Sequence, residues 1–199
     1  MNKHIKKTVI LSIFFLLGLN QLQAQSFYKL ADSKNNTMKL AGTSTLHKWD
    51  MTAGIFSSRA LFDFKPGSTT ELTSLKSLTF TLAVANLSSG ENGLDKNAYK
   101  ALKTKDFKNI EYKLASASIL HESGDKFVLK TRGELTIAGF TKVIIMDVRC
   151  VLNNDGTITC TGNDTLNMTD YQVKPPTFML GAMKTGDAVT LDFTVVYKK

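Results

Sequence analysis

Hydrophobic and polar residues alternate along most of the chain, which is the pattern of strands that bury one face. The clearest case surrounds Gly139, where the alternation of residues 127–137 stops and then resumes at Val143. Alternation on both sides of a turn residue predicts a long antiparallel hairpin with one face in water. Residues 72–87 and 189–197 repeat the pattern and predict two more half-buried strands.

Further strands are predicted between these. They cover residues 27–30, 38–56, 56–64, 110–120 and 157–163. Within residues 38–56, one face of the predicted strand would carry Thr45, His47, Trp49, Met51 and Ala53. The fold class is therefore all-β, with about eight main antiparallel strands, a number that can close into a barrel around one small ligand.

A single helix is predicted at about residues 95–103. Asp95 is a natural N-cap residue. The apolar stripe of this helix is formed by Leu94, Ala98, Ala101 and Leu102. In an otherwise all-β chain, we expect a lone amphipathic helix to lie across the sheet or to close one mouth of the barrel.

The N-terminus predicts export. Lys3, Lys6 and Lys7 precede an apolar run from Thr8 to Leu19, which is short for a membrane span and is followed by polar residues. We interpret residues 1–24 as a signal peptide cleaved near Ala24, with an uncleaved anchor helix as the alternative. Residues 25–199 would then form one periplasmic or secreted domain.

The charge of +8 does not identify a partner. The lysines are scattered, and arginine occurs only at positions 59, 132 and 149. Scattered lysines are typical of a solvated surface. Without clustered arginine and aromatic residues, nucleic acid is not an expected partner.

Cys150 and Cys160 are the only cysteines. The loop Asn154–Gly156 has its glycine at the third position, which favours a three-residue hairpin turn and pairs the two cysteines across neighbouring strands. A cross-strand disulfide is one alternative for an exported protein, and two small buried hydrophobic residues are the other.

Catalytic and metal-binding patterns are not found in the sequence. His47 has Asp50 nearby, but the two side chains would point to opposite faces of a strand. The residues fit neither a structural zinc site nor a phosphate loop, so we expect no metal, no cofactor and no enzyme activity.

Large apolar residues are the remaining candidates for function. They are expected to line an apolar binding cavity: Trp49, Met51, Phe80, Leu82, Val84, Leu102, Phe107, Tyr112, Phe178, Met179, Met183 and Phe193. Polar side chains expected at its mouth are His47, Tyr99 and Tyr171. The alternative is that these residues simply fill the barrel.

Several segments resemble the YceI-like family of exported bacterial proteins. Residues 133–142 read GELTIAGFTK and resemble the hairpin of that family. Residues 94–112 resemble its helix, aromatic residue and following strand, and residues 42–49 resemble its first long strand. Residues 169–190 resemble its Asp-aromatic-Gly segment and final strand, although Gln172 replaces the usual glycine.

The resemblance implies a lipocalin-like antiparallel barrel whose apolar cavity holds an amphipathic lipid. In characterised members this lipid is a polyisoprenoid, an isoprenoid quinone, or a long-chain fatty acid or amide. The expected function is to sequester or carry such a lipid, with a membrane surface as candidate donor or acceptor and a homodimer as candidate assembly. Two alternatives stay open: an enzyme or redox accessory that acts on a bound lipid through His47, and a filled barrel that serves as an envelope stress or interaction module.

Overall fold

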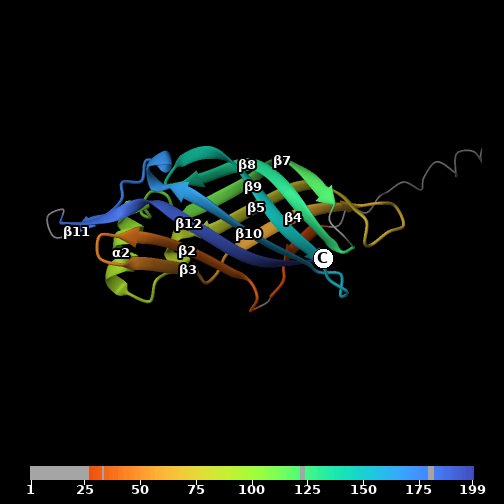
Figure 1. The fold of residues 1–199 in the computed structure, drawn as a ribbon, viewed down its shortest axis with the longest axis horizontal. Helices are drawn as coiled ribbons and strands as arrows, with labels where there is room; N and C mark the ends of the chain where they lie inside the picture. Colours follow the sequence, from red (N-terminus) through yellow and green to blue (C-terminus); the bar gives the residue numbers. More distant parts are fainter. Residues whose placement is uncertain (1–26, 33, 122–123, 179–181) are drawn as a thin grey trace, which may run out of the picture.

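The computed structural model describes residues 27–32, 34–121, 124–178 and 182–199. The predicted signal peptide lies outside these residues. These described residues form an antiparallel barrel, and the α-helix among them lies at one end (Figure 1).

Eight strands close the barrel, as the alternation predicted. In order around the ring they are β1 (Phe27–Leu30), β4 (Ser57–Phe64), β5 (Leu72–Ala83), β7 (Asn109–His121), β8 (Lys126–Ile137), β9 (Phe140–Leu152), β10 (Ile158–Asn167) and β12 (Met183–Lys198). The ring closes where β1 pairs with β12, with Leu30 opposite Tyr197. All pairings are antiparallel.

Shorter elements extend the sheet at one end. They are β2 (Thr37–Ser44), β3 (Lys48–Ala53), β6 (Leu87–Ser88), β11 (Thr177–Phe178), the α-helix α2 (Asn92–Ala101) and the 3-10 helices η1 (Val84–Asn86) and η2 (Met168–Tyr171). Strand β2 pairs with β12 and then with β3, so the hairpin β2–β3 continues the wall beside α2 (Figure 1).

The hairpin predicted around Gly139 is β8–β9. It pairs without interruption from Lys126 opposite Val151 to Ile137 opposite Phe140. Its two turn residues, Ala138 and Gly139, have φ of 49° and 83°. Two successive positive φ angles are typical of a type I′ turn, whose twist matches that of the flanking strands.

Strands β9 and β10 pair over a much shorter length. Only Arg149 to Leu152 pair with Ile158 to Thr161. The Cys150–Cys160 register predicted from the loop is confirmed. Beyond these four pairs, β9 pairs only with β8 and β10 pairs only with β12. The 3-10 helix η2 contacts both β9 and β10.

Several predicted boundaries were wrong. Residues 38–56 form not one strand but a hairpin, because the Ser44 hydroxyl accepts from His47 N–H and donates to His47 C=O and so closes a turn. Helix α2 begins three residues before Asp95, and Asp95 is not its N-cap. The Asp95 carboxylate instead accepts from Ser88 Oγ and from the backbone and hydroxyl of Ser89.

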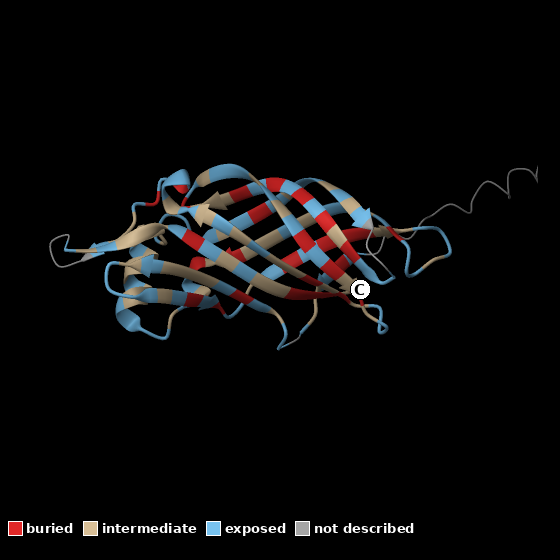
Figure 2. Cartoon of the chain, viewed as in Figure 1, coloured by how far each residue is buried: buried red, intermediate tan, exposed pale blue. Residues whose placement is uncertain are grey.

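Buried and exposed residues alternate along the strands (Figure 2). At the end of the barrel away from α2, aromatic side chains fill the interior. Phe62 packs edge-on against Tyr28 and Tyr197, with ring centroids 5.2 and 5.7 Å apart. The Tyr197 hydroxyl hydrogen-bonds to Ser58 Oγ at 2.7 Å.

Candidate functional site

Two apolar cavities occupy the rest of the barrel interior. Cavity 1 has a volume of about 130 Å³ and cavity 2 a volume of about 140 Å³. Both are lined by the same four side chains at their junction: Leu40, Ile110, Ile137 and Leu166. Because they share these walls, the two cavities adjoin along the barrel.

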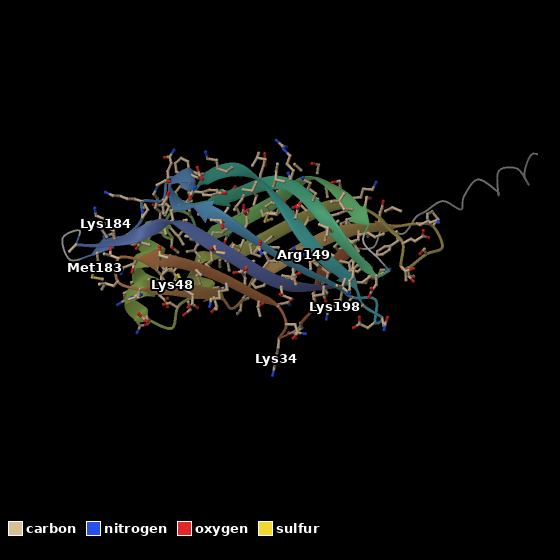
Figure 3. The ribbon with its side chains drawn as sticks, viewed as in Figure 1. Lys34, Lys48, Arg149, Met183, Lys184 and Lys198 are labelled. Carbon is tan, nitrogen blue, oxygen red and sulfur yellow. The ribbon has the colours of Figure 1, made fainter. Side chains whose placement is uncertain are left out.

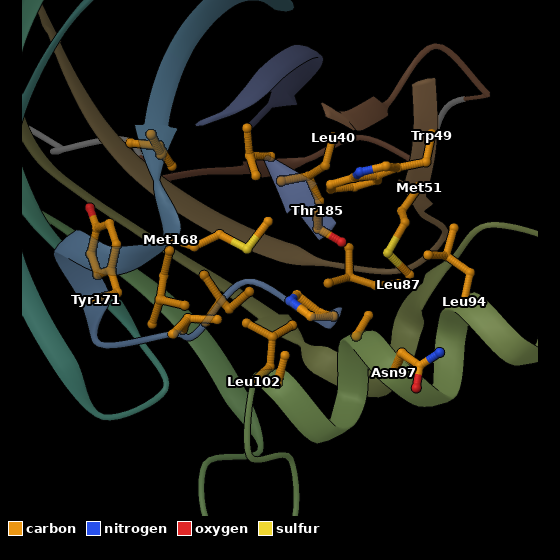
Figure 4. Close-up of a pocket in the computed structure, with 18 of the residues that line it drawn as sticks. Leu40, Trp49, Met51, Leu87, Leu94, Asn97, Leu102, Met168, Tyr171 and Thr185 are labelled. Atoms are coloured by element: carbon orange, nitrogen blue, oxygen red, sulfur yellow. The ribbon is translucent and has the colours of Figure 1, made fainter. Parts of the chain in front are cut away.

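Cavity 1 lies between α2 and the hairpin β2–β3 (Figure 4). Its lining combines Trp49 and Met51 from β3 with Leu94, Ala98 and Leu102 from α2 and the turn after it. Its polar lining residues are Asn97, Asn167, Thr185 and Tyr171. A few polar groups in an apolar lining are typical of a small-molecule site, where they orient the ligand.

Trp49 is held against the wall of cavity 1 by two local features. Its Nε1 donates to Thr43 C=O at 3.1 Å. Its ring lies over Gly42, the residue opposite it on β2, where a Cβ atom would overlap the indole. Glycine at this position therefore lets the indole lie flat against the sheet.

Cavity 2 lies deeper, between cavity 1 and the aromatic cluster. Its inner walls come from alternate residues of the long strands, among them Leu82, Leu129, Leu135, Met146, Leu191 and Phe193. Its far wall is formed by Phe62 and Tyr197 of the aromatic cluster. Burial raises the pKa of Tyr197, so its hydroxyl is neutral there.

Seven of the twelve predicted lining residues line these cavities. Cavity 1 has Trp49, Met51 and Leu102, and cavity 2 has Phe80, Leu82, Tyr112 and Phe193. The side chain of Phe178 and all of Met179 lie outside the described part of the chain.

Three predicted lining residues are elsewhere. Val84 is buried in η1 and packs in the core beside cavity 1 without lining it. Phe107 is 37% exposed, and its ring covers Gly139 on the outside of the hairpin turn. Met183 starts β12, away from both cavities. The strand predicted over residues 72–87 ends at Ala83, so the alternation that placed Val84 beside Leu82 was wrong there. Phe107 lies between α2 and β7, where no strand alternation applies.

The predicted mouth residues differ in their roles. His47 lies exposed in the β2–β3 turn, with Nδ1 2.9 Å from Lys48 C=O, and lines neither cavity. Tyr99 is structural, because its hydroxyl donates to Leu87 C=O at 2.6 Å. Tyr171 does line cavity 1 and is 2% exposed. Burial, followed by the charges of Asp170 and Asp164, raises the pKa of Tyr171 to about 12.

The two cysteines face each other beside cavity 2. Both are free thiols, with their sulfur atoms 2.7 Å apart, and Cys160 lines the cavity. Burial, strengthened by Cys160, raises the pKa of the Cys150 thiol well above its ordinary value. The disulfide stays a prediction.

Sequence reasoning missed the residues at the junction of the cavities. Ile137 belongs to the hairpin motif itself, Ile110 lies between two polar residues, and Leu40 follows Met38 at the strand period of two. The same alternation that identified the strands could have found them. Size misled the prediction, which favoured aromatic and methionine side chains over ordinary aliphatic ones.

Some kinds of site are absent from the described residues. Within residues 27–32, 34–121, 124–178 and 182–199, no three His, Cys, Asp or Glu side chains are grouped as metal ligands would be. In the same ranges, no helix is both long enough and apolar enough to cross a membrane.

A family model described as the YceI-like domain matches residues 31–197, which is most of the chain. The chain belongs to the YceI-like family. A comparison with curated protein sequences gives no significant match.

Solved structures share the fold of this YceI-like protein. A polyisoprenoid-binding domain from Saccharophagus degradans has a TM-score of 0.64 at 12% identity, covering 86% of this chain and 97% of that one. BcnA from Burkholderia cenocepacia has a TM-score of 0.61 at 17% identity, covering 81% and 95%. The YceI protein from Campylobacter jejuni has a TM-score of 0.56 at 21% identity, covering 75% and 84%. At these identities the likeness shows the fold.

Proposed function

We propose that this protein is an exported carrier that sequesters an amphipathic lipid inside its barrel. The observation that supports this most directly is the pair of adjoining apolar cavities, joined at Leu40, Ile110, Ile137 and Leu166. A long narrow apolar space fits a polyisoprenoid, an isoprenoid quinone, or a long-chain fatty acid or amide. The polyisoprenoid-binding description of the Saccharophagus neighbour adds support for this ligand class.

The driving force would be burial of the hydrocarbon. Each methylene taken from water contributes about 0.8 kcal/mol, so a chain of modest length gives tight binding without charged contacts. In cavity 1 the hydroxyl of Thr185 offers a hydrogen bond to a head group.

The two alternative functions are less well supported. A filled barrel does not fit the open volume in its interior. A reaction through His47 would need this side chain to reach the ligand, and it lies in an exposed turn instead.

Native mass spectrometry of protein purified from its own compartment, followed by solvent extraction, would test the proposal. We expect a bound mass that is lost on extraction and that has the solubility of a lipid. Protein that is consistently empty, and that binds no offered lipid with micromolar affinity or better, would refute the carrier function.

We also propose that lipid is exchanged at a membrane surface through the β2–β3 turn. Leu46 is 66% exposed at its tip. Thr45 donates hydrogen bonds to Lys184 C=O, so this turn lies beside the start of β12. The side chains of Lys48 and Lys184 lie at this same end of the barrel (Figure 3). An apolar tip flanked by cations suits an anionic membrane surface.

Vesicle co-sedimentation would test this exchange site. We expect binding to vesicles of anionic phospholipid that weakens with added salt and weakens further in Leu46→Glu. The matched control is Ile55→Glu, which replaces another exposed apolar residue (73% exposed) outside the β2–β3 turn. Equal binding by Leu46→Glu and wild type would refute the role of the turn.

A further inference from the structure

A tyrosine hydroxyl in cavity 2 lacks a hydrogen bond. Tyr112 on β7 is 7% exposed and lines the cavity. Its Oη is buried and has no hydrogen-bond partner among the described residues. Leaving a buried hydroxyl unpaired costs free energy, and most buried polar side-chain atoms in proteins are paired.

The surrounding structure makes room for this hydroxyl. The Tyr112 ring and Oη lie over Gly133 of the neighbouring strand β8, where a Cβ atom would overlap them. Two residues before Gly133 on the same strand, Thr131 also lines cavity 2 and is 4% exposed. The Thr131 hydroxyl donates its proton to Met146 C=O at 3.1 Å.

Electrostatics agrees with this placement. Burial raises the pKa of Tyr112, and the approach of the Thr131 hydroxyl partly opposes the rise, although the two side chains do not have the geometry of a hydrogen bond. The phenol is therefore neutral and keeps its proton, and Thr131 is close enough to influence it. Tyr112 Oη is a free donor in a chamber whose other walls are almost entirely apolar.

A plain hydrocarbon chain would not satisfy this donor. Alkyl chains present only C–H groups, so filling cavity 2 with one would leave the phenol as unpaired as it is in the empty barrel. An oxygen atom that accepts from Tyr112 Oη would remove the cost. A carbonyl oxygen suits the site, because it accepts a hydrogen bond and brings no donor that would need a partner of its own.

We propose that Tyr112 is a specificity-determining residue, which hydrogen-bonds a carbonyl oxygen carried by the part of the lipid that reaches cavity 2. The proposal rests on the carrier function above and adds to it a chemical class: lipids with a ketone, amide or quinone carbonyl at that depth. Thr131 positions the site beside Tyr112.

Matched lipids that differ by one oxygen provide the test. A long-chain methyl ketone and the n-alkane of the same chain length would compete with a fluorescent fatty-acid analogue for wild type and for Tyr112→Phe. We expect wild type to prefer the ketone about tenfold beyond the preference in Tyr112→Phe, because the substitution removes the donor and keeps the ring. The infrared band of the bound ketone carbonyl should lie at lower frequency in wild type than in the variant.

Tyr99→Phe is the matched control, because it deletes a tyrosine hydroxyl that lies outside both cavities. It should keep the wild-type preference for the ketone. A fatty amide and a prenylated quinone, compared in the same two proteins, would show which source of carbonyl gains most from Tyr112.

The possible failures can be told apart. If neither ketone nor alkane displaces the probe from wild type, the carrier function itself fails. If both bind and Tyr112→Phe changes neither the preference nor the carbonyl band, the carrier function stands and the role of Tyr112 is refuted. An equal increase in affinity for ketone and alkane in Tyr112→Phe would likewise refute the role of Tyr112. It would mean that the hydroxyl had paired with a water molecule, which either ligand displaces, and not with the ligand.

Discussion

Blocking the passage between the two cavities should shorten the longest chain that the protein can bind. Ile110 is one of four side chains that line both cavities. In Ile110→Trp the larger side chain would occupy the junction, leave cavity 1 open and close cavity 2 to the ligand. The variant therefore separates binding in the two chambers.

The expected loss of affinity follows from the length of cavity 2 that the ligand can no longer enter. Along β8 the lining of cavity 2 runs from Leu129 to Ile137, which is about 27 Å of strand and roughly 20 Å along the axis of a tilted barrel. Each pair of methylenes kept out of this space costs up to about 1.6 kcal/mol, or about 15-fold in Kd. A chain that loses four buried methylenes should bind roughly 200-fold more weakly than in wild type.

A series of straight-chain fatty alcohols of increasing length, each displacing a fluorescent analogue, would measure this. Wild-type Kd should fall with each step until the chain fills both cavities, and in Ile110→Trp it should level off at a shorter chain. Glu111→Trp is the control, because the neighbouring residue is exposed on the outer face of β7. Ile110→Trp should keep the melting temperature of wild type. If its affinities then level off at the same chain length as those of wild type, the ligand does not pass from cavity 1 to cavity 2 beside Ile110.

Three further outcomes are expected. Trp49 is the only tryptophan and lines cavity 1, so a brominated fatty alcohol should quench its fluorescence; undiminished emission at saturation would argue against a ligand in that cavity. The raised pKa of Tyr171 means that the folded state keeps a proton that the unfolded state releases above pH 10, so the free energy of unfolding should fall from pH 10 to about 12. Denaturant titrations should show a smaller fall in Tyr171→Phe, and an identical fall would contradict the assignment. Cys150 and Cys160 in protein from an oxidising compartment should resist alkylation in denaturant until a reductant is added, whereas immediate labelling would favour two buried thiols.

The barrel was predictable because its signal is repeated in every strand. Alternation around Gly139 specified β8–β9 down to the turn, and the three-residue loop fixed Cys150 opposite Cys160. The hairpin β2–β3 was missed because Ser44 to His47 contains neither glycine nor proline. The hydrogen bonds of the Ser44 side chain make that turn, and they leave no periodic pattern.

The site was only partly predictable, because strand facing tells which side chains enter the barrel and not whether they touch open space. Leu82 and Val84 were treated alike, yet only Leu82 lines a cavity. Phe107 was assigned to the interior for its size, and its packing on Gly139 depends on how the turn after α2 meets a hairpin more than thirty residues later. Such contacts are set by tertiary packing, which a single sequence does not display.

The short pairing of β9 with β10 affects the girth of the barrel. Along the pairings β7–β8, β8–β9 and β10–β12, spreading two neighbouring strands would break long ladders of backbone hydrogen bonds, each worth about 1 kcal/mol. Here the ladder ends after the pairs between Arg149–Leu152 and Ile158–Thr161, and η2 bridges the strands through side chains. The circumference can therefore increase between β9 and β10 at a lower energetic cost than at those three long pairings, so a branched or ring-bearing guest would be accommodated here rather than between β8 and β9.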